Sequence, residues 1–112
     1  MGTEISKREA RPLGQAVVEA TAARLRILGE AKRVALLEAL AEGEASVQEL
    51  ADRIGVPHQN ASHHLSLLRR AGVVGRRADG PTAVYAIEDW SAWWVIGQLA
   101  GTVGEEAERD PG

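Results

Sequence analysis

A basic stretch without any acidic residue occupies the middle of the chain. Between Arg53 and Ala78 there is no Asp or Glu, although the whole chain carries a net charge of -3. The stretch contains Arg53, Arg69, Arg70, Arg76, Arg77, His58, His63 and His64. Arginine and phosphate form paired hydrogen bonds, so this local positive charge suits contacts with a phosphate backbone. A chance clustering of surface arginines is the alternative interpretation.

The three histidines are poorly spaced for a metal site. His63 and His64 are adjacent, so on a helix they point about 100° apart. Cysteine is absent, which excludes disulfides and thiolate ligands. The acidic tail from Glu105 to Asp110 is interpreted as a solvated end. We therefore expect no metal and no cofactor; His63 is expected to contact nucleic acid, and His64 to pack with a backbone hydrogen bond.

The sequence also lacks the residue sets that enzymes use. It has no cysteine nucleophile and no glycine-rich phosphate loop. Ser62 lies beside His63 and His64 on one expected helix, which does not produce the geometry of a catalytic triad. We therefore expect a protein that is not an enzyme.

The spacing of apolar residues predicts helices over about 13–28, 30–41, 46–54, 57–71 and 89–107. Ser46 and Glu49 are spaced to form a capping box at the start of the third helix. Gly55 and Val56 make a short turn, and Pro57 suits the first turn of the next helix. Two helices joined by so short a turn form a helix-turn-helix.

The helix expected over 57–71 has one apolar face and one polar face. Ala61, Leu65 and Leu68 share the first. The opposite face and its flanks contain Gln59, Asn60, Ser62, His63, Ser66, Arg69 and Arg70. Uncharged polar residues followed by a basic end are what a helix in the major groove of DNA requires.

After Gly72 the apolar period changes to two. Residues 73–77 and 82–87 are expected as strands, joined by a turn at 78–81. This hairpin, with Arg76 and Arg77 on its first strand, would form a wing beside the helix-turn-helix. The predicted fold is mainly α with a small β-hairpin (α+β).

The length and composition fit one domain. We expect a flexible arm over 1–11, one winged helix-turn-helix domain over 12–107 and a flexible tail over 108–112. No signal peptide or membrane span is apparent in the sequence, so a cytoplasmic location without a membrane partner is expected.

Three segments of the chain resemble ArsR/SmtB regulators. The matching segments are Leu28 to Leu37, Ser46 to Ala51 and Ala61 to Val74, which resemble their second helix, third helix and recognition helix with its exit into the wing. Tyr85 stands where the return strand of the wing usually has an aromatic residue. The resemblance implies a homodimer that regulates transcription by binding an inverted repeat in double-stranded DNA.

This resemblance and the patterns above define two expected surfaces. The expected DNA-binding residues are Ser46, Gln48, His58, Gln59, Asn60, Ser62, His63, Ser66, Arg69, Arg70, Arg76, Arg77, Thr82 and Tyr85. The expected dimer interface joins the first and last helices through Leu13, Val17, Ala20, Trp90, Trp93, Trp94, Gly97 and Ala100.

The sequence departs from the family at the positions that sense metals. Many members have a Cys pair at the start of the third helix, where this chain has Ser46 and Gln48, and its last helix has no His. Regulation is therefore expected from a separate sensor protein, or from a small molecule bound near the tryptophans. If no small molecule binds there, the tryptophans are expected to belong to the core or to the dimer interface. The alternatives are an unusual metal-responsive repressor and a winged-helix module that binds proteins.

Overall fold

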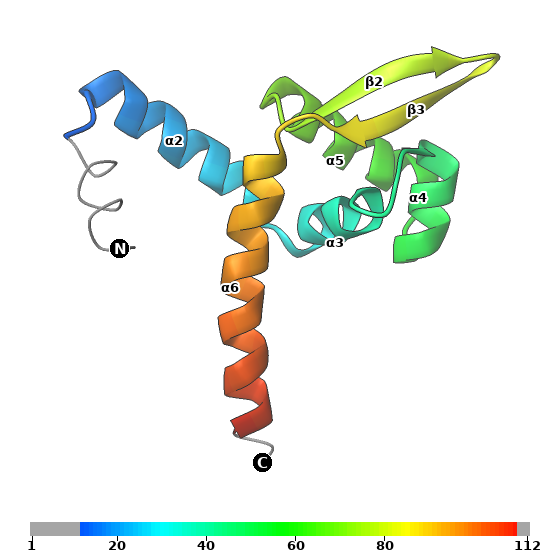
Figure 1. Ribbon diagram of the computed structural model, residues 1–112. Helices are drawn as coiled ribbons and strands as arrows, with labels where there is room; N and C mark the ends of the chain where they lie inside the picture. The colour runs from blue at the N-terminus through cyan, green and yellow to red at the C-terminus, as the bar shows by residue number, and fades with distance from the viewer. Residues whose placement is uncertain (1–11, 110–112) are drawn as a thin grey trace.

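The computed structural model describes residues 12–109, which form five helices and a three-stranded antiparallel sheet of order β1-β3-β2. The elements are α2 (Gln15–Leu28), α3 (Ala31–Leu40), β1 (Ala45–Ser46), α4 (Val47–Ile54), α5 (His58–Arg70), β2 (Val74–Asp79), β3 (Thr82–Ile87) and α6 (Trp90–Arg109). The sheet, α3, α4 and α5 form the body, whereas α2 and α6 extend away from it in different directions (Figure 1). The predicted winged helix-turn-helix fold is confirmed, with β2 and β3 as the wing.

The core lies where the helices of the body meet the sheet. Its largest fully buried side chains are Leu36, Leu37, Leu40, Leu50, Leu65, Leu68, Val73 and Val74. Burial of each such side chain stabilises the fold by about 1.5–3 kcal/mol. Ala61, Leu65 and Leu68 have no exposed area, which confirms the predicted buried face of α5.

Local interactions define the turn between α4 and α5. Ser46 Oγ accepts a hydrogen bond from Glu49 N at 3.1 Å, and Glu49 Oε1 accepts one from Ser46 N at 2.9 Å, which confirms the capping box. Gly55 ends α4 with φ +74°, a left-handed conformation that favours glycine. Pro57 directly precedes α5 as its N-cap.

The sheet differs from the expectation in two respects. A third strand, β1, was not predicted; its residues Ala45 and Ser46 pair with Tyr85 and Val84. The first wing strand continues past Arg77 to Asp79, so the loop of the hairpin is shorter than expected. Two residues are too few to show the alternating apolar pattern that predicts a strand. The strand β1 is therefore identified only by its pairing with β3.

Large apolar side chains remain exposed along α2 and α6. The side chains concerned are Leu13, Val17, Val18, Leu25, Trp90, Trp94, Leu99 and Val103, each between 46% and 65% exposed. Ala20, Gly97 and Ala100, from the expected dimer interface, are exposed as well. Of the three tryptophans only Trp93 packs against the core, so the interpretation of Trp90 and Trp94 as core residues is wrong for the single chain.

The last helix continues to Arg109, two residues beyond its expected end. The expected arm over 1–11 and residues 110–112 of the expected tail lie outside the described residues. Within the described part of the chain, no helix combines the length and the apolar character needed to cross a membrane.

Candidate nucleic-acid interface

The outward face of α5 carries polar and basic side chains and no acid. His58, Gln59 and His63 are exposed in its first half, and Arg69 and Arg70 are exposed at its C-terminal end. The partly buried side chains at its edges are Asn60, Ser62 and Ser66. This order places uncharged donors and acceptors where base edges would lie and cations where phosphates would lie.

Three of the expected contact residues have constrained side chains. Asn60 Oδ1 is buried and has no hydrogen-bond partner among the described residues, so this oxygen reaches a base only if the side chain rotates. Ser46 Oγ is held by the capping box. Gln48 is exposed, and its Nε2 donates to Asp52 Oδ1 at 2.8 Å.

The two arginines of the wing lie on opposite faces of the sheet. Arg76 pairs with Tyr85 across the strands, and Arg77 pairs with Val84; successive residues of a strand alternate between faces. Tyr85 is 6% exposed and belongs to the core, so Arg76 lies on the face turned toward the helices. The expectation that Tyr85 contacts DNA is therefore corrected, because its side chain is occupied in packing.

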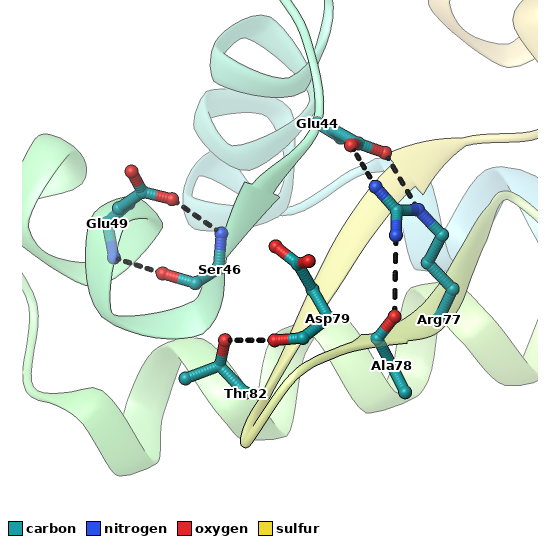
Figure 2. A network of polar contacts seen from close by, with 7 residues as sticks. All are labelled: Glu44, Ser46, Glu49, Arg77, Ala78, Asp79 and Thr82. Atoms are coloured by element: carbon teal, nitrogen blue, oxygen red, sulfur yellow. Dashed lines mark hydrogen bonds and ion pairs between the residues drawn. The ribbon is translucent and has the colours of Figure 1, made fainter.

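Arg77 already has a carboxylate partner. Its Nε donates to Glu44 Oε2 at 3.2 Å and its Nη2 donates to Glu44 Oε1, as Figure 2 shows. The hydrogen bonds and the negative charge of Glu44 raise the pKa of Arg77. Thr82, at the turn of the hairpin, donates from Oγ1 to the backbone oxygen of Asp79 at 3.0 Å. Arg76, in contrast, is exposed and forms no ion pair within residues 12–109.

His64 connects the buried side of α5 to α3. Its side chain is 9% exposed, and its Nδ1 lies 2.9 Å from Nη1 of Arg33. A guanidinium can only donate, so Nδ1 accepts and the ring is neutral with its proton on Nε2. Burial lowers the pKa of His64, and the carboxylate of Glu30 opposes this shift. The expected packing role of His64 is confirmed, but its partner is a side chain and not the backbone.

Arg33 and Glu44 were not identified from the sequence as parts of this region. Arg33 also donates from Nε to the backbone oxygen of Ile27, at the end of α2, so it joins α2, α3 and α5. Its partner His64 is 31 residues away in sequence, and Arg77 is 33 residues from Glu44. No local pattern predicts contacts over such separations.

The described residues contain no group of three or more His, Cys, Asp or Glu side chains that could hold a metal ion.

Comparison with known proteins gives matches along most of the chain. Residues 28–77 match the family model described as a helix-turn-helix domain. The HTH-type transcriptional repressor SmtB of Mycobacterium tuberculosis is 30% identical over 96 residues, which cover 86% of this chain and 71% of that protein. The HTH-type transcriptional regulator KmtR of the same species is 45% identical over 64 residues. The KmtR match covers 57% of this chain and spans about half, 49%, of that protein's length.

Solved structures share the fold. NolR from Sinorhizobium fredii superposes with a TM-score of 0.74 at 30% identity, over 84% of this chain and 97% of that chain. Mb0332 from Mycobacterium bovis, described as a homodimeric winged helix-turn-helix DNA-binding domain, superposes with a TM-score of 0.76 at 24% identity, over 89% and 94% of the two chains.

The His64 site predicts a loss of stability in mild acid. The pKa of His64 is lowered in the folded state, so below its ordinary value of about 6.5 the unfolded chain binds more protons than the folded chain. The free energy of unfolding should therefore fall as the pH decreases from about 7.5 to 5.5, above the range in which carboxylates titrate. Urea unfolding followed by circular dichroism measures this.

His64→Asn provides the test of that assignment, because an amide oxygen can still accept from Arg33 and does not titrate. This variant should show a flatter dependence on pH over the same range, whereas His58→Asn, at an exposed position on the same helix, should keep the wild-type slope. An unchanged slope in His64→Asn would assign the pH dependence to another group.

Proposed function

Since the chain belongs to the ArsR/SmtB family of winged helix-turn-helix transcriptional regulators, which are DNA-binding proteins and not enzymes, we propose that it binds a specific double-stranded operator as a homodimer. The observation that carries this proposal is the exposed, acid-free face of α5 with Arg69 and Arg70 at its end. Like its relative SmtB, it would act as a repressor where its operator overlaps a promoter. Binding to chromosomal DNA would also account for the cytoplasmic location expected from the sequence.

In the proposed complex α5 enters the major groove. Gln59, Asn60, Ser62 and His63 lie nearest the base edges, as the N-terminal half of a recognition helix does. The phosphate contacts come from Arg69, Arg70 and Arg76, whose side chains are exposed and form no ion pairs within residues 12–109. The residues placed around this centre are Ser46, Gln48, His58, Ser66 and Thr82.

The proposed dimer interface is formed by α2 and α6. Both helices carry exposed apolar side chains, including Val17, Trp90 and Trp94, and Leu13 is exposed just before α2; a monomer rarely leaves such surfaces uncovered. A two-fold axis between these helices would set the two recognition helices about 34 Å apart, which is one turn of DNA. The homodimeric state described for Mb0332 supports the proposal of a dimer.

The proposed regulation does not use a metal bound to one chain. Ser46 and Gln48 are poor ligands for thiophilic metals, and the chain has no cysteine. A ligand shifts the equilibrium between two conformations only if it binds them with different affinity. We therefore propose that a separate sensor protein controls DNA binding by docking on the dimer.

A small molecule is the second candidate signal, and one groove favours it. This groove, of about 360 Å³, lies between α2 and the start of α6 and is lined by Leu25, Leu28, Ala92 and Val95, with Arg24 and Asp89 forming an ion pair at 3.0 Å. None of the three tryptophans lines it, so a ligand there would not stack on an indole ring. The groove lies along the proposed dimer interface, where a ligand could alter dimer geometry.

Affinity measurements on two duplexes distinguish residues that contact phosphates from residues that contact bases. Arg76→Ala should weaken binding to all sequences and lower the slope of log affinity against log salt by about 0.9. Gln59→Ala should cost about 1–3 kcal/mol on the operator and less on other DNA. Fluorescence anisotropy with a duplex from the protein's own promoter region, and with a scrambled duplex, measures both effects.

The control is Arg26→Ala, which removes the same charge from an exposed position on α2 and should change neither quantity appreciably. Unchanged affinity and specificity in the triple variant Arg70→Ala/Arg76→Ala/His63→Ala would refute the proposed interface. A protein with no salt-dependent affinity for any duplex would favour the protein-binding alternative.

The dimer is tested by sedimentation. The wild-type protein should be dimeric at micromolar concentration, and Trp94→Glu should produce a folded monomer because it puts a charge in an apolar interface. Trp94→Phe, which keeps an apolar ring, should remain dimeric. The proposal is contradicted if the wild-type protein is a monomer with full affinity for DNA.

Titration of the pure protein with zinc and nickel tests the absence of a metal signal. Calorimetry should show no stoichiometric site of sub-micromolar affinity, and operator affinity should not change when either metal is added. A tight site that alters operator affinity several-fold would overturn the proposal. His58, His63 and the acidic tail would then be the first ligands to replace.

A further inference from the structure

The outer half of the wing extends beyond the body of the molecule. Residues 76–82 are all exposed, so no burial of apolar surface fixes their position. In the part of the chain that the structure describes, side-chain hydrogen bonds join this segment to another element only through Arg77 and Glu44. Apart from the strands β2 and β3 themselves, this pair is therefore the side-chain contact that joins the outer half of the wing to the rest of residues 12–109.

The position of the pair follows from the sheet. In the order β1-β3-β2, Ser46 of β1 and Arg77 of β2 both pair with Val84 of β3, so the three residues form one row. Arg77 reaches Glu44, which precedes β1, only by extending across β3. Val84 is 8% exposed although it faces away from the core, as expected if the Arg77 side chain covers it.

Each of the three nitrogens of the Arg77 guanidinium donates one hydrogen bond within the protein. Nε and Nη2 bind the two oxygens of Glu44, and Nη1 donates to the backbone oxygen of Ala78 at 3.3 Å (Figure 2). A two-point contact between guanidinium and carboxylate fixes orientation as well as distance. Arg77 thus has a defined direction before any DNA is present.

Glu44, the other member of the pair, lies just before the helix-turn-helix in the chain. Glu44 is followed by β1 and by the capping box of Ser46 and Glu49, which begins α4 (Figure 2). The Glu44 carboxylate is therefore two residues from the N-cap of α4. The ion pair of Glu44 with Arg77 therefore connects the wing to the start of the helix-turn-helix.

The face of the sheet that carries Arg77 is acidic. Gly75, Arg77 and Asp79 share this face by strand alternation, and a Cβ at Gly75 would collide with the carboxylate of Glu88. Glu44 and Asp79 therefore lie near Arg77, and Glu88 lies against Gly75 on the same face, so negative charge on this face disfavours a phosphate there. Arg76, on the opposite face, has no such neighbours among the ion pairs of residues 12–109.

We propose that Glu44 and Arg77 form a clamp that positions the wing against the helix-turn-helix, so that Arg77 is a positioning residue and Arg76 makes the phosphate contact of the wing. The proposal rests on the proposed DNA-binding function. It revises the expectation from the sequence, in which both arginines bind phosphate. If Arg77 instead left Glu44 to bind phosphate, the Glu44 carboxylate would compete with DNA for Arg77. Removing that carboxylate would then strengthen DNA binding.

The first measurement needs no DNA. Heteronuclear NOE values of the backbone amides of Ala78, Asp79, Gly80 and Thr82 report the mobility of the wing tip. Glu44→Gln and Arg77→Gln should each lower these values, because either change removes the ion pair. Glu42→Gln is the matched control: it removes the same charge and a comparable exposed pair, Glu42 with Arg53 at 3.4 Å, which does not touch the wing.

The second measurement is duplex affinity of the same variants and of Glu44→Gln/Arg77→Gln. A clamp predicts that each single change weakens binding by about two- to fivefold, the range expected for a surface ion pair, and that the double change costs no more than either one. Glu42→Gln should bind as well as the wild-type protein or slightly better, since it removes a negative charge.

Two results would overturn the clamp: unchanged wing mobility in Glu44→Gln, or tighter DNA binding by Glu44→Gln than by Glu42→Gln. Failure of the wild-type protein to bind any duplex, with the wing mobilised in Glu44→Gln, would refute the proposed function and leave the clamp intact.

Discussion

Burial of one face of α5 determines where its other residues lie. Ala61, Leu65 and Leu68 have no exposed area, and His64 next to them is held by Arg33. Because a helix is rigid at 3.6 residues per turn, fixing these positions turns His63 and Gln59 outward. The core of the body is thus also what presents the candidate DNA-binding face, and changes that loosen it would alter affinity for DNA as well as stability.

For phosphate binding, the distribution of charge over this molecule matters more than its net charge. The chain is acidic overall, yet the acid-free stretch from Arg53 to Ala78 contains all of α5 and all of β2 except Asp79. The acids near the wing, Glu44 and Glu88, lie on the face opposite Arg76. Screening in salt limits charge interactions to about 10 Å, so acids on the far side of the molecule oppose phosphate binding only weakly.

The two helices outside the body have little to pack against in a single chain. Trp93 and Ile96 attach the start of α6 to the core, while residues 97–108 are exposed throughout. Arg24 on α2 bonds Asp89 just before α6, so the two helices meet near the exit of the wing. Any event that rearranged α2 and α6, whether a partner chain or a ligand, would act close to the elements that carry the candidate interface.

The order and approximate bounds of the helices, the capping box at Ser46, the hairpin and the polar face of α5 could be predicted from the sequence alone. These features depend on periodicity and on contacts between residues a few positions apart, which local sequence encodes. The features that sequence patterns did not predict depend on tertiary packing: the strand β1, the burial of Tyr85, the exposure of Trp90 and Trp94, and the pairs Arg33–His64 and Glu44–Arg77. The physical reason is distance along the chain: the members of these two pairs are 31 and 33 residues apart, and only the packing of α3, α5 and the sheet brings them together.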